Sequence, residues 1–291
     1  MSSAHPRVVV TGAAGKLGRA VVRDLVENGY GVLALDRVAP VLPGVDFSFV
    51  RTDLTDHGQV VEAVTGRVDE RGGPFDAVVH LAAVPAPGLV PNATTFANNV
   101  PSTWNVFDAA RAAGITSVVW ASSETVLGLP FDAPPPSAPL DEEYRVRPES
   151  TYSLGKAVEE EMAHHFCRWN PSLTMTGLRF SNVMEVADCA AFPSFDADVT
   201  ARKWNLWGYV DARDAAQAVR LSVQRSGGGF EAFIVANADT VMTRSSASLM
   251  AEVFPDVEVR RELGEHETLL GIDKARRLLG YDPQHTWRDH V

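Results

Sequence analysis

Tyr152 and Lys156 stand four positions apart in the segment 152–156, a spacing that places a phenol and an ammonium on the same face of a helix. A free phenol has a pKa of about 10 and is a poor base at neutral pH. A neighbouring ammonium stabilises the phenolate and lowers that pKa toward the working range. The pair therefore predicts that Tyr152 takes a proton from a reacting group or returns one to it.

Hydroxyl and carboxyl side chains follow a predicted strand at 116–121, where Ser122, Ser123 and Glu124 stand in succession. Open α/β sheets bind ligands at the carboxyl ends of their strands. A serine hydroxyl at that edge can polarise the oxygen of a bound substrate. Glu124 has two interpretations, contact with a substrate hydroxyl or contact with solvent, and the sequence leaves both open.

A glycine-rich turn lies between the first predicted strand and the first predicted helix. It contains Gly12, Gly15 and Gly18, with Lys16 and Leu17 between Gly15 and Gly18. Glycines there let the backbone turn tightly, let a pyrophosphate approach and let the helix pack on the sheet. The amino terminus of the helix adds N–H groups and a favourable dipole for the anion. The spacing of these glycines differs from the commonest dinucleotide fingerprint by one residue. The assignment of a dinucleotide site therefore needs support from other residues.

Asp36 supplies that context, because it ends the second predicted strand 18 residues after Gly18. An acid near this distance meets the adenosine ribose hydroxyls of a dinucleotide. Its charge repels a 2′-phosphate, which favours NAD over NADP. Arg37 beside it can neutralise that repulsion, so NADP stays as the less favoured cofactor.

The elements that must position these groups alternate along the chain. Short β-branched runs predict strands, and longer segments with apolar residues three and four apart predict helices. The expected strands are 7–11, 31–36, 46–51, 76–80, 116–121 and 173–178, and the expected helices are about 15–28, 56–68, 95–113 and 149–169. This alternation predicts an α/β fold, a doubly wound Rossmann parallel sheet.

The tail is less regular and predicts a small carboxyl-terminal substrate lobe. We expect a dinucleotide-binding domain at 1–178 and a lobe at 179–291, interleaved with a last helix from Asp211 and a last strand at 231–236. The proline-rich stretch 130–139 reads equally as a binding lid or a spacer. Trp204 and Trp207 suit either stacking on a sugar ring or packing in the core or a dimer contact.

Composition excludes several classes of protein. The 291 residues, 45% of them hydrophobic, can bury a large core. The net charge of -11, with no basic stripe, argues against nucleic acid as a partner. No apolar run reaches the length of a membrane span or a signal peptide core, and two isolated cysteines make neither a disulfide framework nor a metal site. We therefore expect a cytoplasmic protein with a small-molecule partner and no metal.

These motifs together resemble the extended short-chain dehydrogenase/reductases, the NAD-dependent epimerase/dehydratase family. The resemblance extends over nearly the whole chain, since 272–281 is similar to the family's carboxyl-terminal helix. By this resemblance the additional cofactor contacts are Asp53, Leu54, Leu81, Ala82, Ala83 and Asn99, and the additional substrate contacts are Ser181 and Asn182.

The resemblance also implies roles for the site residues. Aligning the family's pattern back from Gly128 makes Ser123 the donor to the substrate oxygen, with Tyr152 and Lys156 completing the catalytic group and also contacting the cofactor. The family's dehydratases carry a second acid where Thr125 stands, which disfavours elimination here.

Three functions follow as expectations. The first is an NAD-dependent oxidoreductase that moves a hydride at a carbinol carbon of a sugar or sugar acid, because the short lobe resembles compact uronate or aldose dehydrogenases. The second is a nucleotide-sugar or sugar epimerase, and the third is a catalytically silent dinucleotide-sensing regulator. The helices at 95–113 and 149–169 resemble those through which the family forms homodimers, so a homodimer is expected.

Overall fold

The computed structural model describes residues 5–68 and 74–291, and its centre is a seven-stranded parallel sheet. The strands lie in the order β10-β7-β5-β4-β1-β2-β3. Their bounds are β1 Arg7–Thr11, β2 Gly31–Asp36, β3 Ser48–Arg51, β4 Ala77–His80, β5 Ser117–Ser123, β7 Thr174–Phe180 and β10 Gly229–Val235. The order reverses between β1 and β4, the place where such sheets bind ligands.

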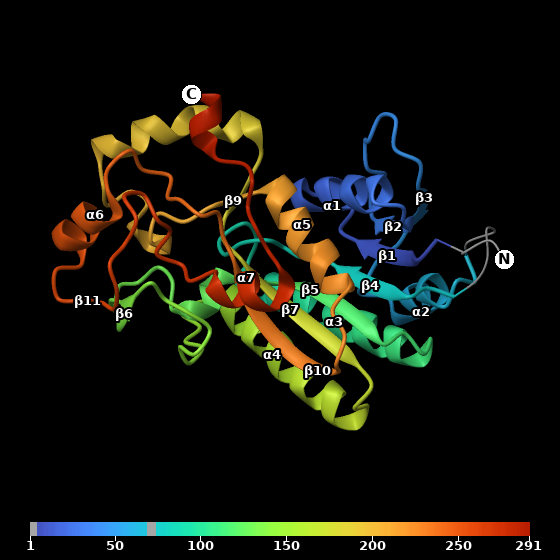
Figure 1. Ribbon diagram of the computed structural model, residues 1–291. Coiled ribbons are helices and arrows are strands. Elements are labelled where there is room, and N and C mark those ends of the chain that lie inside the picture. The colour runs from blue at the N-terminus through green and yellow to red at the C-terminus, as the bar shows by residue number, and fades with distance from the viewer. Residues whose placement is uncertain (1–4, 69–73) are drawn as a thin grey trace.

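Helices cover both faces of the sheet, as a parallel sheet requires (Figure 1). One face packs against α1 (Lys16–Glu27), α5 (Ala212–Val223) and α7 (Asp273–Leu279), and the other against α2 (His57–Val64), α3 (Asn92–Ala112) and α4 (Thr151–Trp169). The central strands β1 and β4 read as unbroken runs of buried valines because both of their faces are covered. This double covering holds the carboxyl ends of the strands in fixed positions.

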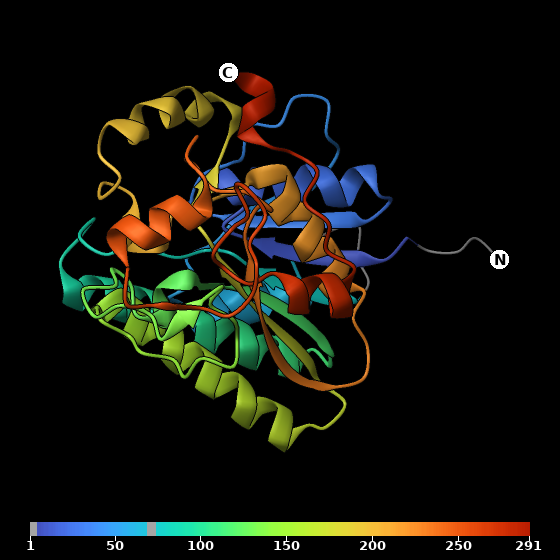
Figure 2. The ribbon, with the colours of Figure 1, turned by 60° about the vertical axis from the view of Figure 1, so that its left-hand side comes forward.

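A lobe stands at the carboxyl-terminal edge of the sheet, formed by short elements (Figures 1 and 2). It contains the strand pairs β6 (Ser137–Ala138) with β11 (Glu258–Val259) and β8 (Val183–Met184) with β9 (Val210–Asp211), the helix α6 (Ser246–Val253), and the 3-10 helices η2 (Val186–Ala197), η3 (Lys203–Asn205) and η4 (Trp287–His290). The segments η2 and η4 lie side by side, joined by the edge contact of Phe192 with Trp287.

The expected strands and helices are present, with differences at their ends. β5 and β7 each run two residues further than expected, to Ser123 and Phe180, because these strands pair with each other along their whole length. The expected helix at 56–68 was too long at its carboxyl end, since α2 ends at Val64. Gly66 has a φ of +74°, which a helix does not continue through.

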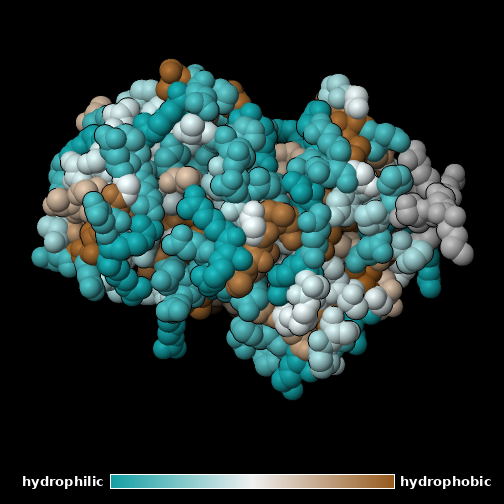
Figure 3. All heavy atoms as spheres, in the orientation of Figure 1, coloured by the Kyte–Doolittle hydropathy of each residue, from teal (hydrophilic) through white to brown (hydrophobic). Residues whose placement is uncertain are grey.

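The division at 178 falls inside β7, and β10 from the later part of the chain pairs with β7 along seven residues. The two-part division of the chain therefore stays a prediction. Within residues 5–68 and 74–291, no helix combines the length and the apolar character needed to cross a bilayer. The face shown in Figure 3 is mainly hydrophilic, with apolar residues in small separate patches.

Candidate active site

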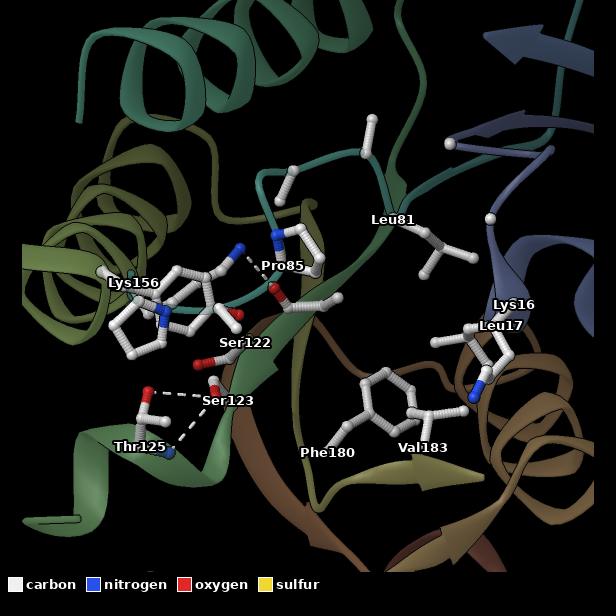
Figure 4. Close-up of a pocket in the computed structure, with 18 of the residues that line it drawn as sticks. Lys16, Leu17, Leu81, Pro85, Ser122, Ser123, Thr125, Lys156, Phe180 and Val183 are labelled. Atoms are coloured by element: carbon white, nitrogen blue, oxygen red, sulfur yellow. Dashed lines mark hydrogen bonds between the residues drawn. The ribbon is translucent and has the colours of Figure 1, made fainter. Parts of the chain in front are cut away.

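A cavity of about 820 Å³ opens over the carboxyl ends of β1, β2, β4, β5 and β7. Gly12, Gly15, Lys16, Leu17 and Gly18 line one end of it, and Ser123, Tyr152 and Lys156 line the other. Figure 4 shows the two groups facing the same space, with Lys16, Leu17 and Leu81 on one side and Ser123 and Lys156 on the other. The volume is within the range of small-molecule and cofactor sites.

The glycine turn has the close backbone approaches that a side chain would prevent. Gly12 has a φ of +69°, and a Cβ there would lie 2.5 Å from the backbone nitrogen of Ala82. A Cβ at Gly18 would lie 2.1 Å from the carbonyl oxygen of Gly12. The turn therefore keeps an open cradle at the start of α1, which fits a pyrophosphate on a helix amino terminus.

The Lys16 side chain, at the cavity end of α1, is held by the lobe. Lys16 Nζ pairs with Asp188 at 2.7 Å, and Arg19 one turn further along pairs with Glu185 at 2.7 Å. These two ion pairs join the first turns of α1 to the start of η2.

Asp36 lies at the end of β2 and lines the cavity together with Arg37. Its Oδ2 accepts a hydrogen bond from Ala14 N at 3.0 Å, so the carboxylate is fixed against the glycine turn. Its Oδ1 accepts from Arg37 N at 2.6 Å. This is the position from which an acid meets the ribose hydroxyls of a bound dinucleotide.

The residues expected near the adenine and nicotinamide also lie at the cavity, with one exception. Asp53, Leu54, Leu81, Ala82 and Ala83 line it. Hydrogen bonds from the backbone and side chain of Thr55 hold the pKa of Asp53 below its ordinary value.

Asn99 is not among the described residues that line the cavity. Its side chain exchanges two hydrogen bonds with the backbone of Val84, at 2.8 and 3.0 Å. It therefore holds the loop that follows β4, and direct contact with the cofactor stays a prediction.

Ser123 is arranged to donate a hydrogen bond into the cavity. Its Oγ accepts from Thr125 N at 3.2 Å and from Thr125 Oγ1 at 3.0 Å. Both lone pairs of the hydroxyl are thus occupied, so its proton is free to go to another acceptor. The neighbouring Ser122 is already engaged, since its Oγ donates to Glu160 Oε1 at 2.6 Å.

Tyr152 and Lys156 lie in the first two turns of α4, and both are buried. Ser150 begins this helix with a capping box, its hydroxyl accepting from Ser153 N. Burial raises the pKa of Tyr152 above its ordinary value, and the Lys156 charge and a hydrogen bond from Ser123 oppose that rise. The Lys156 ammonium lies 5.9 Å from the centroid of the Tyr152 ring.

A buried ion pair fixes the catalytic helix to the sheet. Arg179 on β7 donates two hydrogen bonds to Glu160 on α4, at 2.9 and 2.8 Å. Glu160 also accepts from Ser122 on β5, so one carboxylate joins three elements. This arrangement fixes the distance between Ser123 on the strand and Tyr152 on the helix.

Glu124 is buried at 3% exposure, which argues against the second of its two interpretations, contact with solvent, and leaves contact with a substrate hydroxyl as a prediction. Asn205 Nδ2 donates to Glu124 Oε1 at 3.2 Å. Burial raises the pKa of Glu124 to about 7, against the opposing effects of Ser181 and Asn205. Glu124 Oε2 and Asn205 Oδ1 have no close hydrogen-bond partner among the described residues. Ser181 and Asn182 line the same end of the cavity.

Trp204 and Trp207 lie in different surroundings, one at the cavity and the other in the core. Trp207 is fully buried and donates its Nε1–H to Val199 O at 2.7 Å, so it is a core residue. Trp204 lines the cavity, and its ring centroid lies 5.1 Å from the Arg202 guanidinium.

Arg213 is held by two hydrogen bonds to Asp211 and is not among the described lining residues.

Several lining residues were not expected from the sequence. They are Thr52, Pro85, Ala86, Pro87, Asn98, Ser102, Ala121, Thr125, Leu129, Pro130, Glu149, Ser150, Phe180 and Val183. The segment 85–87 begins two residues after the expected cofactor contact Ala83, and this proximity could have predicted it. Leu129 and Pro130 bring the start of the proline-rich stretch to the cavity, whereas β6 further along pairs with β11.

Comparison with known proteins defines the class. The model of the NAD dependent epimerase/dehydratase family matches residues 8–236, and the chain belongs to that family. NAD is its cofactor, and the cradle at Gly12 and Gly18 and the acid at Asp36 fit that molecule.

Relatives within the family differ in what they are named for. The chain is 27% identical to the UDP-glucose 4-epimerase of Rhizobium leguminosarum bv. trifolii, over 96% of this chain and 93% of that protein. It is 30% identical to the uronate dehydrogenase of Pseudomonas syringae pv. tomato, over 57% of this chain and 58% of that protein. Several curated relatives, including this one, match over only about half of their own length.

The solved structure of MoeE5 in complex with UDP-glucuronic acid and NAD has the same fold, with a TM-score of 0.71 and 22% identity over 98% of this chain and 96% of that one.

Proposed function

We propose that this protein is an NAD-dependent oxidoreductase that transfers a hydride between NAD and a carbinol carbon of a sugar or sugar acid. One observation carries the proposal: a single cavity joins Asp36 and the glycine turn to Ser123, Tyr152 and Lys156. A cofactor held by the first group would share the cavity with the second, where the proton-transferring side chains stand. A silent sensing regulator would need only the first group.

The residues divide the proton chemistry among themselves. Bound NAD supplies the hydride acceptor or donor. Ser123 donates a hydrogen bond from its hydroxyl to the reacting oxygen, which orients the substrate and stabilises charge on that oxygen. Tyr152 takes the hydroxyl proton during oxidation or returns it during reduction. Lys156 stabilises the phenolate form of Tyr152, and the lowering effect of its charge on the Tyr152 pKa supports this role.

The substrate end of the cavity supports a hydroxyl-rich substrate. Its lining includes Glu124, Thr125, Ser181 and Asn182, which can each exchange hydrogen bonds with hydroxyls. Among the described lining residues at this end, apart from Lys156, there is no lysine or arginine to meet a diphosphate. A simple sugar or sugar acid therefore fits better than a nucleotide sugar.

Epimerisation is the second candidate, because two relatives named UDP-glucose 4-epimerase match over 96% of this chain. Both reactions use the same three side chains, and they differ in the fate of the cofactor. A dehydrogenase must release reduced cofactor in each cycle, whereas an epimerase must retain it through both half-reactions.

The experiment follows from that difference. Purified protein and NAD are given sugars, sugar acids and nucleotide sugars, while absorbance at the NADH band and product stereochemistry are both followed. We expect NADH in proportion to the sugar or sugar acid consumed. Conversion of a substrate to its stereoisomer with no net NADH would replace the dehydrogenase proposal with the epimerase. Tyr152→Phe is the control and should lower turnover by about two to four powers of ten while NAD still binds.

We also propose that the protein works in the cytoplasm. Its two cysteines, Cys167 and Cys189, are free thiols, which suits a reducing compartment.

A further inference from the structure

A second carboxyl, Glu159, lies against the catalytic lysine inside the protein. Its side chain is fully buried, and its Oε2 accepts a hydrogen bond from Lys156 Nζ at 2.9 Å. Lys156 Nζ donates a second hydrogen bond to Ala121 O at 2.7 Å. An ammonium has three N–H bonds, so one remains for the cavity side. The two inner contacts therefore fix which way Lys156 points.

A buried chain of polar side chains begins at β1 and ends on α3, the helix that packs against α4 and thus against the helix of Glu159. Thr11 Oγ1 accepts from Leu81 N and Ala82 N, so its own proton goes to His80 Nδ1 at 2.8 Å. His80 then carries its proton on Nε2 and donates it to Thr103 Oγ1 at 3.0 Å.

The hydrogen-bonded chain runs from the strand below the glycine turn through β4 to Thr103 on α3. Burial raises the pKa of Glu159 above its ordinary value, and the charge of Lys156 and the hydroxyl of Thr103 oppose that rise. Glu159 Oε1 has no close hydrogen-bond partner among the described residues.

The Thr11–His80–Thr103 chain itself carries no charge. Complete burial lowers the pKa of His80 to about 3, with a further contribution from Lys156, so the imidazole is neutral. Burial acts to lower the pKa of Lys156 as well, but the Glu159 carboxylate raises it above its ordinary value. The charged partners in this interior are therefore Lys156 and Glu159.

We propose that Glu159 is a positioning residue for proton transfer at Tyr152: it fixes the orientation of Lys156 and places a negative charge behind the ammonium that faces the phenol. Thr103, at the end of the Thr11–His80–Thr103 chain, favours the ionised form of Glu159. The inference rests on the proposed function, because it assigns the proton transfer to Tyr152. It explains why an acid occupies a site that an apolar residue would fill at lower desolvation cost.

The sign of the effect follows from the groups around the phenol. Lys156 lowers the pKa of Tyr152, whereas Glu159 on α4 and Glu124 on η1 (Glu124–Leu127) raise it.

Two other titratable groups near Tyr152 do not alter the direction of this pKa change. Glu160 is engaged by Arg179 on β7, and His80 on β4 is neutral. Removing the Glu159 charge therefore leaves the cation of Lys156 less opposed, and the pKa of Tyr152 falls.

The test is Glu159→Gln, which keeps the shape and removes the charge. We expect the acidic limb of the pH profile of kcat/KM for oxidation to move to lower pH by about one unit, because that limb reports ionisation of the free enzyme's base. Thr103→Val, which removes the hydroxyl that favours ionised Glu159, should move the limb in the same direction by less. Glu161→Gln, on the exposed side of the same helix, should leave it in place.

A second readout needs no turnover. The ¹³Cζ resonance of labelled Tyr152, assigned by its loss in Tyr152→Phe, is titrated in the wild-type protein and in both variants. We expect the Tyr152 pKa to fall in Glu159→Gln and, by less, in Thr103→Val. Folded variants whose titration and pH profile both match the wild type would overturn the proposal. A protein that turns over no substrate would overturn the proposed function, and the titration would still decide the role of Glu159.

Discussion

Glu124 is a carboxyl held out of water at the substrate end of the cavity, with one oxygen bonded to Asn205 and the other without a close partner among the described residues. Its pKa of about 7 means that it changes charge near neutral pH. A carboxyl in this condition donates a hydrogen bond when protonated and accepts one when ionised. The same residue can therefore meet a substrate hydroxyl in either role, depending on pH.

Stability should follow this titration. The folded pKa of Glu124 is raised above its unfolded value, so its contribution to stability is complete below about pH 4.5 and is lost as pH rises through about 7. Glu124→Gln has no proton to lose. We expect the free energy of unfolding of the variant, relative to wild type, to improve by roughly 1–3 kcal/mol between pH 5 and pH 8.

Urea unfolding at the two pH values measures the difference. Glu161→Gln, at an exposed position of α4, serves as the control and should give the same offset from wild type at both. An equal offset for Glu124→Gln as well would show that the Glu124 carboxyl is already ionised at pH 5 in the folded protein.

The sequence predicted the residues whose chemistry depends on local spacing. Tyr152 and Lys156 are one helical turn apart, and the three glycines lie within seven consecutive residues, so neighbours in the chain carry the signal. Glu159 and Thr103 gave no such signal, because a polar residue in a helix ordinarily faces solvent. Their burial depends on α3 packing against α4, which no local pattern specifies.

At the scale of elements, the turn from β1 into α1 has no room for a side chain at its packing glycine. A methyl group at Gly18 would meet Gly12 O at 2.1 Å and Ala13 Cα at 2.8 Å, so backbone must move. We expect Gly18→Ala to lower the free energy of unfolding by about 1–3 kcal/mol. The distorted cradle should weaken NAD binding by roughly tenfold or more.

Thermal unfolding and calorimetric NAD titration test this together. Gly58→Ala is the matched control, because Gly58 also lies in the first turn of a helix but a Cβ there meets only the Asp56 side chain, at 3.3 Å. Wild-type NAD affinity in Gly18→Ala would show that the turn tolerates the shift.

Elements were predictable in proportion to their length and burial. The long buried strands and the helices on the sheet have periodic apolar patterns, and they appear where expected. The pairs β6 with β11 and β8 with β9 have two residues per strand. Such pairs form because segments distant in the sequence meet in the lobe. Two residues are too few to show a strand pattern, so the sequence could not predict these pairs.

At the scale of the whole molecule, the face formed by α3 and α4 exposes large apolar side chains. Phe96, Trp104 and Leu154 are 37%, 42% and 47% exposed. We propose that this face is the contact of a homodimer, as the resemblance implies. Light scattering at micromolar concentration should give twice the 31.5 kDa of one chain.

A charge on that face should separate the subunits. We expect Trp104→Glu to give a monomer, because a carboxylate in an apolar contact loses its hydration. Val41→Glu places the same charge on a residue that is 78% exposed in the loop after β2, and should leave the mass unchanged. A wild-type protein that scatters as 31.5 kDa would remove the dimer from the proposal.

The pairing of β10 with β7 has a consequence for the order in which the chain takes shape. All seven residues of β7 are buried, and β10 covers one edge of that strand. The covering strand begins 49 residues after β7 ends, since Phe180 and Gly229 bound the gap. While the ribosome is still making those residues, the nascent chain exposes an apolar strand edge of the kind that promotes aggregation. A gene truncated at residue 178 would make that transient exposure permanent.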